Sequence, residues 1–188
     1  MKKGIILLLS LAFSAAGYSQ HFALKNNLAY DAMLTPNLGM EIKLAKRITL
    51  DISGNYNPFT FSDNKKFKHW LAQPELRFWL CEKFNGSFIG IHGHGGEYDA
   101  ANIKLPFNLF KNLENSRYKG YFYGGGISIG HQFVLSKHWN LETSIGGGYA
   151  NIKYDKYGPE KNAPKKESDH YNYFGVTKAT ISLIYIFK

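Results

Sequence analysis

Hydrophobic and polar residues alternate along most of the chain that follows residue 20. In the segment 37–44, for example, Leu38, Met40, Ile42 and Leu44 alternate with asparagine, glycine, glutamate and lysine. Period-two patterning bounded by turn residues is typical of half-buried β-strands and not of helices. The pattern predicts eight strands, over residues 22–32, 37–44, 48–56, 68–80, 87–98, 119–134, 139–151 and 173–187. Pro74 is expected to weaken the fourth strand and to mark a bulge.

The links between these strands differ in length. Those at 33–36, 45–47, 81–86 and 135–138 are short, whereas those at 58–67, 100–118 and 154–170 are long and polar. Outer-membrane barrels combine tight periplasmic turns with longer external loops in this way. The motif Leu44-x-Lys46-Arg47 recurs as Leu135-x-Lys137-His138, so two of the tight turns should share one structure. The predicted fold is all-β: an eight-stranded antiparallel transmembrane up-and-down β-barrel.

Charged residues of both signs recur on the polar face of the predicted strands. An eight-stranded barrel has a lumen just wide enough for side chains to fill it, and opposite charges there limit each other's desolvation cost. The same face carries Lys25 and Lys43. We expect one structural network in a filled polar lumen, formed by Asp31, Glu41, Asp51, Glu75, Arg77, Glu142 and Lys178.

The apolar face carries aromatic residues near the ends of the strands. Membrane barrels have aromatic girdles at both interfaces, and closure removes the unpaired strand edges that lipid would penalise. The expected girdle residues are Tyr30, Tyr56, Trp70, Tyr121, Tyr123, Trp139, Tyr149 and Tyr185. The alternative is a soluble periplasmic barrel or sandwich, in which the apolar face points inward. The mixed-sign polar face and the girdles favour the membrane barrel.

The first residues have the composition of a secretory signal. A basic start, Met1-Lys2-Lys3, precedes an apolar run over residues 4–16 and small residues before Gln20. The apolar run is shorter than the roughly 20 residues that a membrane-spanning helix needs. We expect cleavage between Ser19 and Gln20, export to the outer membrane, and one barrel domain over residues 20–188. Cys81 is the one cysteine of the chain, so no disulfide can form within it.

The positive charge is concentrated in the predicted long loops. The formal net charge is +9 and falls to +7 when Lys2 and Lys3 leave with the signal. Export argues against a nucleic-acid partner, so the lipid A phosphates of lipopolysaccharide are the expected anionic neighbours. Solvated loops without a specific partner are the alternative. The candidate external rim comprises Lys65, Lys66, Lys68, Lys104, Lys111, Arg117, Lys156, Lys161, Lys165 and Lys166.

Several short motifs together resemble a known family over nearly the whole mature chain. They are Lys25-Asn26-Asn27-Leu28-x-Tyr30-Asp31, Thr35-Pro36-Asn37, Asn57-Pro58-Phe59, Lys68-His69-Trp70, Gln73-Pro74-Glu75-x-Arg77, Phe84-Asn85-Gly86 and Thr177-Lys178-Ala179. The chain resembles a Bacteroidota family of small outer-membrane barrels, a domain of unknown function broadly similar in architecture to OmpA and OmpX. The resemblance implies fold and location and carries over no catalytic residue. The C-terminal strand also resembles the signal that such barrels present to their assembly machinery.

Three constellations suggest chemistry less specifically. His92-x-His94 with Glu97 has the spacing of a metal site, but without a fixed third ligand we expect both histidines to be polar lumen residues. The triplets 124–126 and 146–148 are glycines without the lysine of a phosphate loop. We interpret them as space for bulky lumen neighbours. No motif predicts a cofactor.

A lipid-modifying enzyme, for acyl transfer or deacylation, is the alternative function. Ser128, His131 and Glu142 lie on neighbouring predicted strands. However, residues three apart face opposite sides of a regular strand, so Ser128 and His131 should not meet. The leading hypothesis is a non-enzymatic barrel that is structural or an accessory subunit of a larger outer-membrane complex.

Overall fold

A computed structural model describes residues 22–60, 66–101, 116–158 and 163–187. It contains eight strands and a single short helix within these ranges. The strands are β1 (Phe22–Asn27), β2 (Asn37–Lys43), β3 (Ile48–Asn57), β4 (Lys66–Trp79), β5 (Gly86–Ala101), β6 (Arg117–Val134), β7 (Trp139–Tyr157) and β8 (Lys165–Phe187), and the helix is α2 (Leu28–Ala32). The predicted signal and its cleavage site lie outside the described residues.

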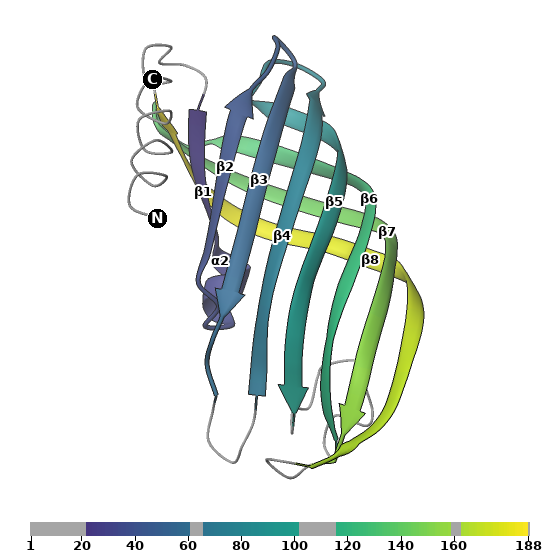
Figure 1. Cartoon of the computed structure of the whole chain (residues 1–188). Helices are drawn as coiled ribbons and strands as arrows, with labels where there is room; N and C mark the ends of the chain where they lie inside the picture. Colours follow the sequence, from purple (N-terminus) through teal and green to yellow (C-terminus); the bar gives the residue numbers. More distant parts are fainter. Residues whose placement is uncertain (1–21, 61–65, 102–115, 159–162, 188) are drawn as a thin grey trace, which may run out of the picture.

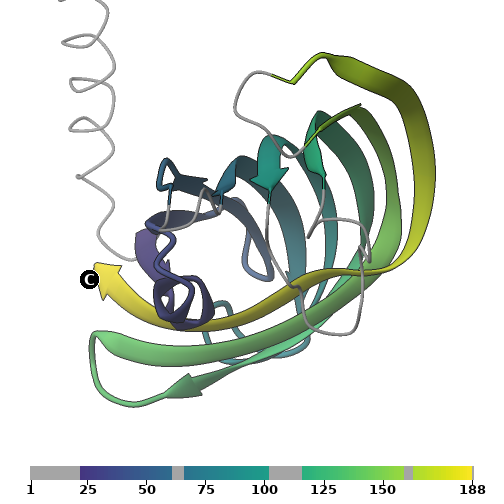
Figure 2. The same ribbon diagram turned by 90° about the horizontal axis from the view of Figure 1, so that it is seen from below.

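The eight strands form one ring-like antiparallel sheet. Each strand pairs with the next along the chain, and β1 pairs with β8 through six residue pairs from Phe22↔Phe187 to Asn27↔Ser182. The two longest ladders join β7 to its neighbours, with nineteen pairs to β8 and eighteen to β6. Figure 1 shows the tight turns at one end of the ring and the longer strands projecting at the other, and Figure 2 shows the ring from below. The predicted antiparallel all-β organisation is confirmed.

The two turns that share a sequence motif also share their hydrogen bonds. The amides of Leu44 and Ala45 both donate to the carbonyl of Ile48, at 2.9 and 3.0 Å. The amides of Leu135 and Ser136 donate in the same way to the carbonyl of Trp139, both at 3.0 Å. The internal repeat in the sequence therefore corresponds to one turn structure that is used twice.

The first strand is shorter than predicted. It ends at Asn27, and residues 28–32 form α2 instead of continuing the ladder. The Asn27 side chain caps this helix by accepting from the amide of Ala29 at 3.1 Å. The Asn37 side chain accepts from the amide of Asn27 at 2.6 Å and donates to its carbonyl at 3.1 Å. These side chains satisfy the backbone locally and so compete with the strand ladder.

Strands β4 to β8 are longer than predicted. Much of the expected loop 154–170 is strand, since β7 continues to Tyr157 and β8 begins at Lys165. In this part of β7 and β8 both faces of the strands carry polar residues. The sequence there therefore shows no alternation of polar and apolar residues that would predict a strand. Pro74 also differs from expectation, because the pairing of β4 with β5 is interrupted there but has the same register on both sides. Pro74 weakens the ladder without forming a bulge.

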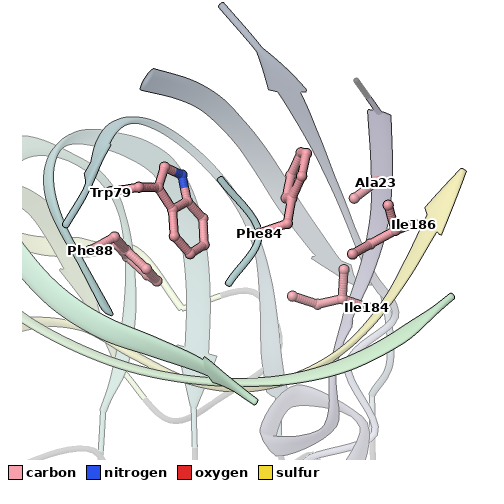
Figure 3. Packing of buried hydrophobic residues seen from close by; sticks show 6 residues of the cluster. All are labelled: Ala23, Trp79, Phe84, Phe88, Ile184 and Ile186. Carbon is pink, nitrogen blue, oxygen red and sulfur yellow. The ribbon is translucent and has the colours of Figure 1, made fainter. Parts of the chain in front are cut away.

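The interior of the ring is apolar at the end of the tight turns. Ala23, Trp79, Phe84, Phe88, Ile184 and Ile186 are buried there and form the apolar plug (Figure 3). Phe84 lies in the β4–β5 turn with φ 58°, so a left-handed residue directs its ring inward. Asn140 Nδ2 fixes this turn by donating to the carbonyl of Phe84 at 2.8 Å. On the side of the plug that is further from the tight turns, the interior becomes polar.

Candidate functional site

Seven charged residues meet in the interior next to the apolar plug. We call Lys25, Glu41, Asp51, Glu75, Arg77, Glu142 and Lys178 the interior ionic cluster; each is at most 5% exposed. Lys25 Nζ lies 2.6 Å from Glu41 Oε2, 2.7 Å from Asp51 Oδ2 and 2.8 Å from Glu142 Oε2. A lysine with its three donors directed at three carboxylates has its hydrogen-bonding capacity filled.

Arg77 connects all four carboxylates of the cluster. Its guanidinium lies 2.9 Å from Glu41, Asp51 and Glu142, and its Nε lies 2.7 Å from Glu75 Oε2. The same guanidinium lies over the Phe88 ring, 4.3 Å from its centre, and so joins the cluster to the plug. Five donors in a rigid fork suit arginine, and not lysine, to this central position.

Glu75 and Lys178 form the other side of the cluster. Lys178 Nζ lies 2.6 Å from Glu75 Oε2, and Ser128 donates a hydrogen bond to Glu75 Oε1. A Cβ added to Gly90 would collide with this carboxylate and with Ser128 Oγ, so any larger residue there would have to displace them. Carboxylates outnumber cations four to three in the cluster, and the uncharged residues Ser128, Thr49 and Gln132 donate further hydrogen bonds to Glu75, Glu41 and Glu142.

The structure brings six of the seven predicted network residues together. Asp31 is the exception: it is exposed on α2, where its Oδ1 accepts from Asn37 Nδ2 at 2.9 Å. The prediction placed it in the lumen because it extended the first strand through residues 28–32, where the chain is helical. Lys25 was identified on the polar face but not as a member of the network. Lys25 lies on the same strand face as Ala23 and Asn27, which are both buried. This shared face was the sequence signal that could have placed Lys25 in the network.

The histidines of β5 both face the interior. His92 and His94 are 2% and 8% exposed, and His92 Nε2 lies 2.9 Å from Thr177 Oγ1. Thr177 and Lys178 both point inward because a register shift in the β7–β8 ladder leaves Thr177 unpaired between Val176 and Lys178. Within the described part of the chain, no group of three histidine, cysteine or acidic residues could hold a metal ion.

The glycine triplets lie where neighbouring strands approach closely. A Cβ at Gly126 would collide with the backbone of Gly147 and Gly148, and one at Gly148 with the backbone of Gly125 and Gly126. At Gly124 the added atom would meet both the backbone of β7 and the His94 ring. At Gly124 the glycine therefore leaves space for the interior His94 ring, as the sequence suggested. Backbone crowding between β6 and β7 is the other reason for these glycines.

The outward surface carries the apolar residues. Aromatic residues occur in two bands: Phe133 and Trp139 near the tight turns, and Tyr123 and Tyr149 ten residues further along β6 and β7. At about 3.3 Å per residue and a tilt of about 40°, ten residues span roughly 25 Å, the height of the apolar band of membrane barrels. Isoleucines at positions 127, 129 and 145 lie between the bands, each more than half exposed. Tyr30, expected in a girdle, lies on α2 instead.

No catalytic triad assembles from the candidate residues. Ser128 bonds to Glu75 inside the ring, whereas His131 Nδ1 lies 2.9 Å from Ser87 Oγ. Glu142 binds Lys25 and Arg77 in the interior ionic cluster. Ser128 and His131 therefore have separate partners, as their spacing on one strand indicated.

The described rim residues are partly neutralised by acidic neighbours. Arg117 binds Asp99 through two hydrogen bonds of 2.7 and 2.6 Å, which raise the pKa of Arg117, and Lys165 lies 2.7 Å from Asp155. Lys156 lies over the Tyr118 ring, 5.9 Å from its centre, while Lys68 is half-buried and Lys166 is exposed. Lys65, Lys104, Lys111 and Lys161 lie outside the described residues, as does the side chain of Lys66.

Comparison with known protein families identifies a family that covers nearly the whole chain. Residues 5–187 match a family described as "Protein of unknown function (DUF3575)". No curated protein matches the chain. No solved structure matches it either. None of the helices in the described residues is long and apolar enough to cross a membrane.

Proposed function

The chain belongs to the DUF3575 family, whose function is unknown, and we propose from its geometry that it is a closed, non-conducting β-barrel of the bacterial outer membrane. In this proposal it has no enzymatic activity and serves a structural or accessory role in a larger outer-membrane complex. The architecture would be similar to that of OmpA and OmpX, and the tight turns would face the periplasm.

One observation carries the proposal: the distribution of polarity is the reverse of that in a soluble protein. Charged residues that are rarely buried in soluble domains fill the interior, whereas large apolar side chains cover the outside. Exposed patches of this extent on a soluble protein would mark an interface or cause aggregation. A surrounding lipid phase removes that difficulty, because it covers the apolar side chains. The pairing of strands around the ring-like sheet satisfies the backbone N–H and C=O groups within the apolar band.

Membrane fractionation tests this location. The full-length protein should appear in the outer-membrane fraction, resist extraction at alkaline pH, and migrate faster unboiled than boiled on SDS gels. Recovery as a freely soluble periplasmic protein would refute the proposal.

The interior ionic cluster explains why the barrel should not conduct ions. Between the cluster and α2 the structure leaves a cavity of about 30 Å³, room for roughly two water molecules. The apolar plug (Figure 3) lies on the other side of the cluster, where the Phe88 ring packs against the Arg77 guanidinium. Purified protein should therefore give no steady conductance in planar bilayers, and porin-like conductance would show that this packing opens.

Contact of the external rim with lipid A phosphates is the second part of the proposal. Among the described rim residues Lys166 is exposed and Lys156 lies over an aromatic ring, whereas Arg117 and Lys165 bind acidic neighbours. Replacing Lys156 and Lys166 with glutamine should weaken binding to lipopolysaccharide. The same change should leave binding to a lipid A preparation without phosphates unaltered. Equal loss for both lipids would argue against phosphate recognition.

A further inference from the structure

The outward surface carries a row of polar side chains inside its apolar band. Ser87 on β5 is paired with His131 on β6, which is paired with Thr143 on β7. The side chains of Ser87 and His131 are hydrogen-bonded at 2.9 Å. None of the three belongs to the interior ionic cluster, and the packing of the interior does not require them.

These three residues lie in an open groove with apolar walls. The groove has a volume of about 580 Å³, and its walls include Leu80, Ile89, Ile129 and Ile145. The short side chains of Ser87 and Thr143 leave the floor of the groove lower than the isoleucines beside it. The groove therefore combines hydrogen-bonding groups on its floor with surfaces that can pack against hydrocarbon.

The position of the groove along the strands gives its depth in a membrane. His131 lies two residues from Phe133, which belongs to the aromatic band near the tight turns. Two residues correspond to about 5 Å along the membrane normal for a strand tilted by about 40°. The polar row is thus just inside the interface, at the depth of the ester groups of a phospholipid, while the isoleucine walls extend toward the acyl chains.

We propose that this groove binds one glycerophospholipid of the periplasmic leaflet. The Thr143 hydroxyl donates a hydrogen bond to the ester or phosphate oxygens of the lipid. The Ser87–His131 pair donates a second one, because their mutual hydrogen bond uses one of the pair's two hydrogens. The acyl chains pack between Ile89, Ile129 and Ile145. The inference rests on the proposed function, because it requires this face to lie in the membrane.

Photocrosslinking tests the site. The full-length protein is reconstituted into phosphatidylethanolamine vesicles that contain a phosphatidylethanolamine with a photoreactive group next to the glycerol. Crosslinked peptides are then mapped by mass spectrometry. In the wild-type protein we expect crosslinks concentrated on 87–89, 129–131 and 143–145. Ser87→Ala combined with His131→Leu should reduce them at least threefold, and the control Ile52→Ala, on the outward face of β3, should not.

Three outcomes would overturn the inference. Crosslinks spread evenly around the outward surface, or unchanged in the double variant, would show ordinary lipid contact. Crosslinks absent from 87–89, 129–131 and 143–145 but present elsewhere on the outward surface would show that lipid does not enter the groove. If the double variant fails to show the gel shift of a folded barrel, Thr143→Val provides the same comparison. Extraction of the wild-type protein from the vesicles at alkaline pH would instead refute the proposed membrane location.

Discussion

Lys178 and Lys165 each have one carboxylate within ion-pair distance, but in opposite surroundings. Lys178 Nζ lies 2.6 Å from Glu75 in the interior, and Lys165 Nζ lies 2.7 Å from Asp155 at the exposed end of β8. A buried ion pair brings little net stability, because desolvation offsets attraction, but removing one partner leaves a buried charge uncompensated. An exposed ion pair is screened by water, so it adds little stability, and removing one of its partners costs little stability. The two lysines therefore form a matched comparison.

Lys178→Ala should destabilise the protein by about 3–5 kcal/mol, because Glu75 then loses its lysine in a buried position. Lys165→Ala should produce little measurable change. The measurement is urea unfolding in detergent micelles or vesicles, followed by tryptophan fluorescence. Glu75→Gln together with Lys178→Met should cost less than the sum of the single changes, because the double change also removes the carboxylate that would otherwise have lost its lysine. Equal midpoints for the two lysine variants would show that the interior is solvated.

At the scale of elements, α2 replaces the end of a strand and is held by one asparagine. Asn37 bonds to both backbone groups of Asn27 and to Asp31, and Asn27 in turn caps the helix. An amide side chain provides the donor and the acceptor that this arrangement needs. The helix has only five residues, so its own hydrogen bonds would not maintain it without these contacts.

Asn37→Ala should therefore loosen the segment 27–37 and cost about 1–3 kcal/mol, since it leaves buried backbone groups of Asn27 without partners. Hydrogen exchange read by mass spectrometry should show faster exchange in this segment and unchanged exchange in β6. Asn172→Ala is the control, because Asn172 also accepts side-chain hydrogen bonds but is exposed. Unaltered exchange in 27–37 would mean that other contacts hold α2.

The elements also show what could be predicted from the sequence. The alternation of Leu38, Met40 and Ile42 predicted β2 because one face of that strand is apolar and the other polar. The prediction failed where side chains determine the backbone, as Asn27 and Asn37 do at α2, and where both faces of a strand are polar, as near Lys165. Most members of the interior ionic cluster could be predicted from the alternation of the two strand faces alone. The register shift at Thr177 could not be predicted in this way, because it depends on how β8 pairs with β7.

At the scale of the whole molecule, the three tryptophans report which surface faces lipid. Trp79 is fully buried in the apolar plug (Figure 3). Its Nε1 donates a hydrogen bond to Thr49 Oγ1 at 2.9 Å. Trp70 and Trp139 are each 43% exposed on the outward surface. A quencher in the hydrocarbon should reach the two outward rings and not the inward one.

Brominated phospholipids should accordingly quench the fluorescence of the wild-type protein in vesicles. Quenching should largely disappear in the variant Trp70→Phe/Trp139→Phe, which retains only Trp79. It should persist in Trp79→Phe. Strong quenching of Trp79 alone would show that the assignment of the two surfaces is reversed.

The short seam between the first and last strands has a consequence for the order of folding. Phe22 meets Phe187 across nearly the whole chain, and six residue pairs join these strands, against eighteen between β6 and β7. Joining such distant segments costs loop entropy that few contacts repay, whereas adjacent hairpins form at little entropic cost. The ring should therefore grow from its C-terminal hairpins and close last at β1. The same seam should be the first to separate when the protein unfolds.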